Sequence, residues 1–384
     1  MKIKPFQWDQ QRGWSESLTN PDQLNPDLIL FFTTLSPDLV QNCCNDVSKH
    51  YPDSPVVGCS SAGEIFGDDV FEDSFSATAL EFESSKVSVR HVLLKDYEGH
   101  TFPAACAASD KLPREGLKSV IVISDGISVN GSELVRGVQK TLGPGVSISG
   151  GLAGDKDQFK ATYVTVNETT KQGMLVIIGL YGENLEIGHG SVGGWDEFGP
   201  VRKITASESN VLKEIDGEPA LDLYKKYLGP EHVEKLPGSA LLFPILVYPE
   251  GEKEKALVRT VLSVNETEKT MTFAGDLPTG SCTQLMRANL DHIVDAAGEA
   301  AKFANIAGNH ETCFALLISC VGRKMVLGQR TADEVESVQE ILGAHVKQLG
   351  FYSYGEISPI IHLDQSCALH NQTMTITVIG EKSA

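Results

Sequence analysis

The chain has 384 residues, enough for two or three domains, and 41% of them are hydrophobic, which is typical of folded proteins with a large core. Acidic residues outnumber basic ones, 51 against 32, and the formal net charge is −19. This charge repels phosphate backbones and anionic headgroups, and the sequence has no basic patch, so we expect neither a nucleic acid nor a membrane surface as a partner.

Targeting and redox signals indicate a cytoplasmic protein. The first residues lack the apolar run of a signal peptide, and no stretch approaches the ~20 apolar residues of a membrane span. The eight cysteines are few for this length, and none are spaced as C-x-x-C. We therefore expect a soluble protein with free thiols in a reducing compartment.

The predicted elements begin after a polar extension over residues 1–27. The first group comprises a buried strand at 28–32, a helix at 37–50, a strand from Val56 that runs into Gly58-Cys59-Ser60-Ser61-Ala62-Gly63-Glu64, and a strand at 75–82. The second group comprises a strand at 120–125, a helix near 134–142, a strand at 146–149 that runs into Gly150-Gly151-Leu152-Ala153-Gly154-Asp155, and a strand at 174–180.

A third group near the end has the same order. It comprises a strand at 314–319, a helix at 332–348, a strand at 351–357 that contains Gly355-Glu356, and a strand at 374–379. In all three groups a strand and a helix lead to a second strand that ends in Gly-Glu or Gly-Asp. We interpret this pattern as an internal repeat of a strand–helix–strand–strand unit.

The segment between the second and third groups differs from them. It predicts a glycine-rich stretch at 182–200, a helix at 219–229, antiparallel strands at 241–248, 256–264 and 270–274, and a helix at 286–303. Glycine, proline and charge cluster at 229–238, so we place a domain boundary there. The sequence thus predicts a two-lobed mixed α/β protein with layered sheets, divided into an extension (1–27) and domains at 28–229 and 230–384.

Candidate site residues follow from the rule that ligands bind beyond the carboxyl ends of strands in open α/β sheets. The rule selects Cys59, Ser60, Ser61 and Glu64 from the first group, Gly150, Gly151 and Asp155 from the second, and Cys320, Arg323, Tyr354 and Glu356 from the third. We expect these ends to converge on a common hollow. The glycines would let the backbone approach a ligand closely.

For two of the candidates the sequence allows both a ligand-binding role and a structural role. The guanidinium of Arg323 suits a ligand carboxylate, but it could equally form a structural salt bridge, for example with Glu356. His370 lies on a predicted strand over 369–378, on the same face as Met374 and Ile376. It could ligate a metal or haem iron, or it could be a core histidine satisfied by a hydrogen bond.

An enzyme is the competing hypothesis. Cys59, Ser60 or Glu64, alone or with Glu356, could act in nucleophilic or acid–base catalysis. Cys59 is also consistent with a packed, inert thiol. Three motifs resemble known sites but lack an essential feature. Cys367-x-x-His370 has the spacing of zinc ligands but no second ligand pair nearby. Gly188–Gly193 has the glycine spacing of a dinucleotide site but is not followed by a helix, and Gly58–Ala62 lacks the last glycine of a nucleophile elbow.

Several motifs, in order, resemble the FIST sensory module over residues 28–380. Its amino-terminal half is matched by Gly58–Ile65, Gly150–Asp155, Gly194-Trp195, Gly199-Pro200 and Ile215–Leu221. Its carboxyl-terminal half is matched by Cys320-Val321-Gly322-Arg323, Gly350–Ile357 and His370-Asn371-Gln372-Thr373.

The resemblance implies an intracellular ligand sensor rather than an enzyme. Family members are proposed to bind small ligands such as amino acids, and some stand-alone members bind haem, sense nitric oxide and signal to a separate histidine kinase. The sequence contains no recognisable output domain, so we expect the stand-alone type. His370 and Asn371 carry over as ligand-binding candidates, with His370 as the candidate ligand of a haem iron.

Overall fold

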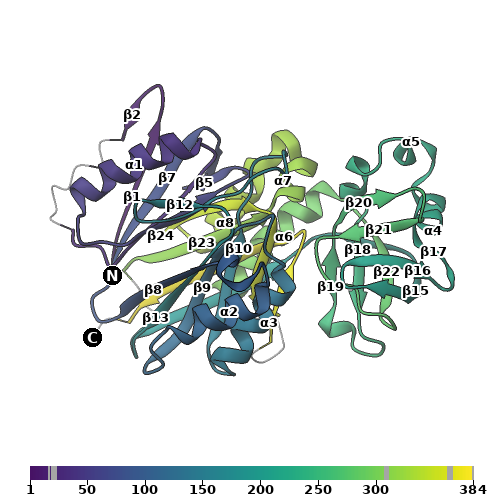
Figure 1. Cartoon of the computed structure of the whole chain (residues 1–384). Coiled ribbons are helices and arrows are strands. Elements are labelled where there is room, and N and C mark those ends of the chain that lie inside the picture. The colour runs from purple at the N-terminus through teal and green to yellow at the C-terminus, as the bar shows by residue number, and fades with distance from the viewer. Residues whose placement is uncertain (16–17, 19–23, 307–310, 361–365, 383–384) are drawn as a thin grey trace.

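The computed structural model describes residues 1–15, 18, 24–306, 311–360 and 366–382. It is a mixed α/β protein with 27% helix, 42% strand and four sheets. Three of the sheets form a larger lobe, and the fourth sheet forms a smaller lobe beside it, drawn in green at the right of Figure 1. The predicted two-lobed mixed α/β architecture is confirmed.

The larger lobe contains one sheet of seven strands and two sheets of six. The first runs in the order β12 (Thr169–Lys171), β11 (Val164–Val166), β4 (Val56–Ser60), β3 (Leu28–Thr33), β7 (Ser74–Glu81), β1 (Lys2–Asp9) and β2 (Gly13–Trp14). The second runs β26 (Cys367–His370), β25 (Gly355–Pro359), β10 (Ser147–Leu152), β9 (Leu117–Ser124), β13 (Met174–Tyr181) and β8 (Lys86–Leu93). The third runs β14 (Leu185–Val192), β27 (Met374–Glu381), β23 (Cys313–Cys320), β24 (Val346–Ser353), β5 (Glu64–Phe66) and β6 (Asp69–Phe71).

The helices of the larger lobe cover the outer faces of these sheets. They are α1 (Pro37–His50) on the first sheet, α2 (Thr101–Asp110) and α3 (Gly131–Leu142) on the second, and α6 (Leu290–Ala304) and α8 (Thr331–Leu342) on the third, with the short α7 (Val321–Leu327) before α8. No helix in the described part of the chain is long and apolar enough to span a membrane.

The internal repeat is visible in the strand pairing. In each sheet of the larger lobe a central strand is parallel to one neighbour and antiparallel to the other. These triplets are β4-β3-β7, β10-β9-β13 and β24-β23-β27. A helix connects the parallel pair in each case, and a glycine stands at the same place in each second strand. A Cβ added at Gly58, Gly150 or Gly350 would lie about 2 Å from the carbonyl oxygen of its partner on the central strand.

The repeats exchange strands in a closed cycle. After the second strand of each unit the chain crosses to another sheet: β5 joins β24, β25 joins β10 and β11 joins β4. The strand predicted over 351–357 is therefore two strands, β24 and β25, in different sheets. Three equivalent backbone hydrogen bonds link the crossings, from Ala62 to Tyr352 (2.8 Å), from Gly154 to Ser60 (3.1 Å) and from Tyr354 to Leu152 (3.1 Å).

The three sheets enclose one shared core. Alternate residues of the central strands point inward, among them Leu30, Ile121 and Leu316, and the residues between them pack against the outer helices. The rings of Phe32 and Phe351 stack across this core with centroids 4.3 Å apart. Both faces of the central strands are buried, which explains their continuous apolar sequences.

Several other element boundaries differ from the predicted ones, and the strand predicted over 256–264 is divided into two, Leu257–Arg259 and Val261–Asn265. Residues 2–9 of the predicted extension form β1, which pairs with β7 along its whole length and buries Phe6. The helix predicted at 332–348 ends at Leu342, because Gly343 adopts a left-handed φ of +82°. The helix predicted at 286–303 begins at Leu290, after the side chain of Asn289 caps its first turn.

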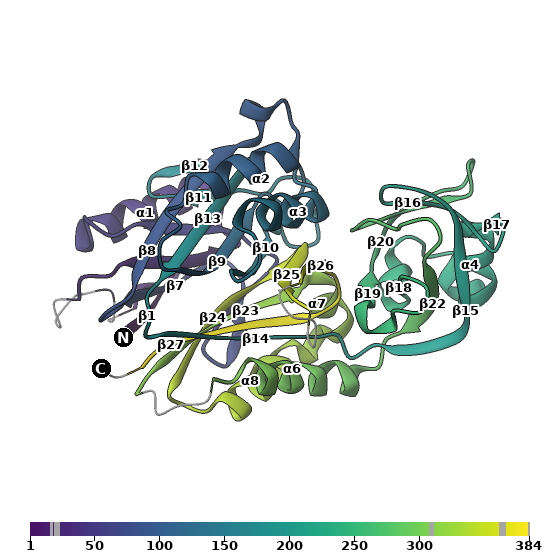
Figure 2. The same ribbon diagram turned by 90° about the horizontal axis from the view of Figure 1, so that it is seen from below.

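The smaller lobe is an insertion between β14 and α6, connected to the larger lobe by two crossings (Figure 2). Its sheet runs β19 (Leu257–Arg259), β18 (Ile245–Tyr248), β22 (Cys282–Arg287), β15 (Asp196–Glu208), β16 (Val211–Ile215), β21 (Thr270–Phe273) and β20 (Val261–Asn265), with β17 (Glu218–Pro219) beside β16. Its helices are α4 (Ala220–Leu228) and α5 (Pro230–Val233). The boundary predicted near 229 lies inside this lobe, and β24 to β27 share sheets with strands from before it.

Candidate functional site

A cavity of about 640 Å³ lies between the two lobes. Its larger-lobe wall follows the carboxyl ends of β9, β10 and β23, and its other wall comes from the smaller lobe. The larger-lobe residues are 126–131, Leu152, Phe159, 320–322, Met325, Tyr354 and Asn371; the smaller-lobe residues are Asn210, Pro237, Gly238, Leu241, 260–262 and 273–275. The volume is in the range of ordinary small-molecule sites.

The loop after β9 is shaped by the buried carboxylate of Asp125. One carboxylate oxygen accepts hydrogen bonds from the backbone N–H groups of Ile127 (2.9 Å) and Ser128 (2.6 Å). The other accepts one from the N–H of Gly173 at 3.0 Å. The negative charge of Asp125 is thus compensated by peptide dipoles, and the loop presents only uncharged side chains to the cavity.

Asp155 organises the mouth of the cavity. Its carboxylate accepts hydrogen bonds from the backbone N–H groups of Phe159, Lys160 and Ala161, each at 2.8 Å, and another from the hydroxyl of Tyr354. The rings of Phe159 and Tyr354 then stack with centroids 4.5 Å apart. Of the predicted site residues, Asp155 therefore acts by positioning Tyr354, which itself lines the cavity.

Two buried polar atoms of the cavity wall have no hydrogen-bond partner among the residues that the structure describes. Asn371 is 1% exposed; its amide nitrogen donates to the carbonyl of His370 at 2.9 Å, but its Oδ1 has no partner. On the opposite lobe, Thr260 is 6% exposed and its hydroxyl is also unpartnered. Buried polar groups are normally satisfied, so these atoms indicate the place of a ligand or an ordered water.

The lobes are joined beside the cavity by the buried Arg259 of β19. Its Nη1 donates to the carbonyl of Leu369 in the larger lobe at 3.0 Å, and its Nε donates to the carbonyl of Asp276 at 3.2 Å. Burial lowers the pKa of Arg259 to about 10, which leaves the guanidinium charged at neutral pH. The interlobe contact at this point depends on one charged donor and a backbone acceptor.

Glu64 and Glu356 occupy equivalent places in two repeats, and neither lines the interlobe cavity. Ser61 donates to Glu64 at 2.6 Å, and Ser353 donates to Glu356 at 2.8 Å, with the same three-residue separation. Both carboxyl groups are fully buried, and burial raises the pKa of each to about 8. The two Ser–Glu pairs lie where the chain crosses between sheets. They do not line the ligand-binding hollow in which we predicted them.

Arg323 does not reach the cavity either. Its guanidinium is fully buried and donates to Glu334, to the carbonyl of Gly193 and to the carbonyl of Ile293 at 2.7 Å. It forms a salt bridge, but with Glu334 and not with Glu356. The carbonyl of Gly193 belongs to the connection that leads from β14 into the smaller lobe, and the carbonyl of Ile293 belongs to α6. These contacts give Arg323 a structural role.

His370 lies at the end of β26, because the strand predicted over 369–378 is interrupted. Gln372 adopts a left-handed φ of +61°, and the chain passes there from β26 of the second sheet to β27 of the third. The Nε2 atom of His370 lies 3.1 Å from the carbonyl oxygen of Ser358. Burial lowers the pKa of His370 to about 4, so the imidazole is neutral.

These residues do not fit a haem held by His370. His370 does not line the interlobe cavity, and the described lining contains no histidine. Cys320 lines the cavity, but burial raises the pKa of its thiol far above the ordinary value, which disfavours a thiolate ligand. Among the described residues no group of three His, Cys, Asp or Glu side chains could hold a metal ion.

The remaining predicted residues pack within the protein. Cys59 is 1% exposed and belongs to the shared core, and burial raises the pKa of its thiol. The hydroxyl of Ser60 accepts a hydrogen bond from the N–H of Tyr163 at 2.9 Å. Gly150 and Gly151 approach neighbouring protein and not a ligand, because they lie in β10 against Val122 and Ile318.

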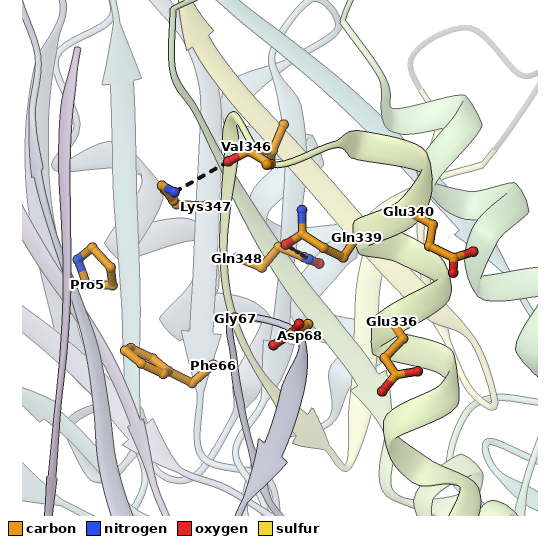
Figure 3. A pocket seen from close by; sticks show the side chains of 11 residues that line it. Pro5, Phe66, Gly67, Asp68, Glu336, Gln339, Glu340, Val346, Lys347 and Gln348 are labelled. Carbon is orange, nitrogen blue, oxygen red and sulfur yellow. Dashed lines mark hydrogen bonds between the residues drawn. The ribbon is translucent and has the colours of Figure 1, made fainter.

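A second cavity of about 630 Å³ lies at the far end of β24 from the interlobe site (Figure 3). The β5–β6 hairpin, β1 and α8 surround it, and its lining includes Asp68, Glu336, Glu340 and Lys347. Its charged lining contrasts with that of the interlobe cavity, where no described lining residue is Asp, Glu, Lys, Arg or His. It lies at the amino end of β24, away from the edge where α/β sheets usually bind ligands.

The sequence reasoning found part of the interlobe cavity and missed the rest. Cys320, Tyr354 and Asn371 were predicted site residues and do line it. Residues 126–131 follow the predicted strand at 120–125, so the same rule could have selected them. Thr260 and the other smaller-lobe residues carry no sequence signal, because the packing of the two lobes alone places them there.

Comparisons with known proteins identify the family of this chain. The FIST N domain model matches residues 27–218, and the FIST C domain model matches residues 220–359. An uncharacterized protein of Methanocaldococcus jannaschii is 23% identical over 365 residues, which cover 88% of this chain and 68% of that protein. The two matched domains meet inside the smaller lobe. The chain belongs to the FIST family of sensory domains, which implies a general role as a signal-transduction sensor.

Proposed function

We propose that the protein is an intracellular sensor that binds a small molecule in the interlobe cavity and signals to a separate protein, such as a histidine kinase. The observation that carries the proposal is that both lobes build the cavity, with unpartnered polar atoms on each wall. A molecule that contacts both walls favours the arrangement of lobes in which both sets of contacts form. The family assignment supports a signalling role.

The connections between the lobes offer a route for the signal. Gly194 has a left-handed φ of +77°, and Trp195 donates from its indole nitrogen to the carbonyl of Gln372 at 2.9 Å. That carbonyl lies one residue from Asn371 of the cavity wall. A ligand that engages Asn371 therefore acts on the same turn that anchors the connection to the smaller lobe, and hinge-type rearrangement about such connections is a common switching device.

An enzyme based on Cys59 and Glu64 is the competing proposal, and the geometry does not favour it. A nucleophilic thiol needs access to its substrate and a lowered pKa. Cys59 is buried in the shared core and its pKa is raised, and Glu64 is enclosed by Ser61 and Ser74. We expect a thiol reagent such as iodoacetamide to label Cys59 slowly in the folded protein. Peptide mass spectrometry measures the extent of labelling.

The sensor proposal is tested by capture of a ligand from cells. The protein is incubated with a low-molecular-weight cell extract, separated by gel filtration and denatured, and the released compounds are identified by mass spectrometry. We expect compounds to be retained by the wild type and lost in Met325→Trp, which places a much larger side chain in the cavity lining. Val201→Trp changes an exposed residue outside the lining and is the matched control.

A second measurement tests sensing itself. Hydrogen exchange of the crossings near Trp195 and Asn289 is compared with and without the retained compound. We expect slower exchange in the loaded protein, because the ligand restricts the lobes. No retained compound, or equal retention by Met325→Trp, contradicts the proposed site; unchanged exchange on binding contradicts the proposed coupling.

A further inference from the structure

We infer that the molecule bound between the lobes is uncharged and largely apolar, and that it donates a hydrogen bond to Oδ1 of Asn371. This inference rests on the proposed function, since it names the ligand class of that cavity. It follows from three independent features of the walls: their charge, their unpartnered polar atoms and their exposed apolar side chains.

The walls provide no counter-charge for an ionic ligand. The described residues that line the cavity are all uncharged, although the chain as a whole carries a formal charge of −19. The nearby carboxylates are already satisfied: Asp125 by three backbone N–H groups and Asp155 by backbone N–H groups and Tyr354. The two buried guanidinium groups near the cavity lie outside its lining: Arg323 is bound to Glu334, and Arg259 donates to the carbonyls of Val258, Leu369 and Asp276.

An ionised ligand would therefore lose hydration without gaining a partner. Transfer of an unpaired charge into a low-dielectric site is strongly unfavourable, whereas transfer of a neutral apolar molecule is favourable. A free amino acid carries both charges in water, and neither charge finds a complementary side chain on the described walls. The amino-acid hypothesis drawn from the family resemblance thus requires partners that the cavity does not supply.

The unpartnered oxygen of Asn371 defines the polar contact. Asn371 belongs to the cavity lining, and because its amide nitrogen is bound to the carbonyl of His370, Oδ1 is left as its free acceptor among the described residues. An acceptor without a partner selects a donor, such as an N–H or O–H group of the ligand. The hydroxyl of Thr260 on the opposite wall can donate or accept, so it adds a second contact without restricting the class.

Exposed apolar side chains define the rest of the ligand. Four large apolar residues that remain 44–46% exposed line this cavity: Ile127, Phe159, Leu262 and Met325. They come from both lobes, and Phe159 stacks on Tyr354 at the mouth. A ligand with an apolar or aromatic body would cover these side chains, and their burial would contribute to its affinity.

The experiment compares matched probes in a competition assay. N-phenyl-1-naphthylamine, a neutral fluorescent amine, reports occupancy of the cavity. Four compounds that share the indole ring are tested as competitors: indole, N-methylindole, indole carboxylate and tryptamine. We expect indole to bind at least tenfold more tightly than the anion or the cation. We also expect indole to bind more tightly than N-methylindole, which lacks the donor.

Variants test whether Oδ1 of Asn371 accepts the hydrogen bond from the ligand. Asn371→Leu removes the acceptor and should weaken indole about tenfold while leaving N-methylindole unchanged. Thermal melting shows whether Asn371→Leu remains folded; should it unfold, Thr260→Val on the opposite lobe supplies a second variant, with an expected threefold weakening of indole. Met325→Trp should abolish binding of the fluorescent amine, and Val201→Trp should not.

The outcomes separate this inference from the proposed function. In one outcome the charged compounds bind as tightly as indole or more tightly, and this binding is lost in Met325→Trp. That result overturns the neutral ligand class but leaves the interlobe site in place. Equal loss of indole and N-methylindole in the folded Asn371→Leu protein overturns the donor contact. Fluorescence that Met325→Trp does not affect overturns the site itself, and with it the proposed function.

Discussion

Arg323 donates two hydrogen bonds, from Nε at 2.9 Å and from Nη2 at 2.7 Å, to the same carboxylate oxygen of Glu334, and neither side chain is exposed to solvent. The second oxygen of Glu334 accepts from Ser319 (3.0 Å) and Tyr352 (2.7 Å). The pair is therefore a fully satisfied buried ion pair that connects α7 and α8 to the third sheet.

Replacement of Glu334 by glutamine should destabilise the protein strongly. The variant leaves the Arg323 guanidinium buried without its counter-charge, and loss of one partner of a buried ion pair costs about 3–5 kcal/mol. Urea unfolding measures this change. Glu336→Gln, at an exposed position of the same helix, is the control and should change stability by less than about 0.5 kcal/mol. Equal stability of the two variants would contradict the structural role assigned to the pair.

Because of the buried glutamates in two of the repeats, we expect the free energy of unfolding to fall as the pH rises. Burial raises the pKa of Glu64 and Glu356 to about 8, above the ordinary value near 4.5. Between these values the folded state retains protons that the unfolded state has released. Their contribution to stability is therefore full below about pH 4.5 and is lost as the pH rises toward 8, by up to about 1.4 kcal/mol per pH unit for each group.

Glutamine at both positions should reduce this pH dependence, because an amide stays neutral throughout. The free energy of unfolding of the double variant, measured at intervals from pH 5 to 9, should fall less steeply than that of the wild type. Glu381→Gln is the control: hydrogen bonds from backbone N–H groups outweigh burial and lower the pKa of Glu381 to about 2. Glu381 is therefore largely ionised in both the folded and the unfolded state from pH 5 to 9, and its replacement should leave the slope in this range almost unchanged. An unaltered slope in the double variant would show that these glutamates are ionised in the folded state.

The glycine shared by the repeats should tolerate no side chain. In Gly150→Ala the new Cβ would lie 1.9 Å from the carbonyl oxygen of Val122, and the residue also has a positive φ of 146°. We expect a loss of at least about 2 kcal/mol in chemical denaturation. Gly238→Ala is the control, because no atom lies within 4 Å of its added Cβ. Similar stability of both variants would contradict the close packing of β10 on β9.

The hydroxyl of Tyr354 should matter for binding at the cavity mouth. Tyr354→Phe removes the hydrogen bond to Asp155 but retains the ring, so we expect a loss of about 1–2 kcal/mol in stability and a severalfold weaker affinity for N-phenyl-1-naphthylamine. Fluorescence titration measures the affinity. Tyr97→Phe, outside the cavity lining, is the control and should bind normally. Identical affinities in all three proteins would exclude a positioning role for the hydroxyl.

Haem ligation by His370 is tested by an absorption spectrum. We expect protein from cells supplied with a haem precursor to show no Soret band that depends on His370, because this buried residue lines neither of the two large cavities. The spectrum of His370→Ala, recorded at the same protein concentration, is the comparison. A Soret band in the wild type that disappears in the variant would reverse our interpretation of this residue.

Local patterns predicted the elements whose residues contact sequence neighbours. The helix at 37–50 was predicted with its observed bounds, because Pro37 suits a first turn and the apolar spacing repeats every 3.6 residues. The buried strands were recognised from their apolar runs. The strand at 351–357 was not correctly divided, because the break at Tyr354 arises where the chain leaves one sheet for another.

The site shows the same division between local and long-range information. The rule for strand ends selected Cys320 and Tyr354, and the family resemblance added Asn371; all three line the cavity. The rule also selected Glu64, Arg323 and Glu356, which are buried elsewhere. A sequence shows that a polar residue follows a strand. It does not show whether the side chain meets a protein partner, and Arg323 meets Glu334 only because α8 packs on the third sheet.

The sequence by itself determined the family, the mixed α/β class and the threefold repeat, because each depends on residue types at short, regular spacings. Only the tertiary structure decided which strands exchange between the sheets, which polar groups are satisfied and where the cavity lies. Those properties depend on bringing together residues that are far apart in the sequence, such as Thr260 and Asn371 on the two walls of the cavity. Local propensity carries no information about such contacts; the packing of whole lobes creates them.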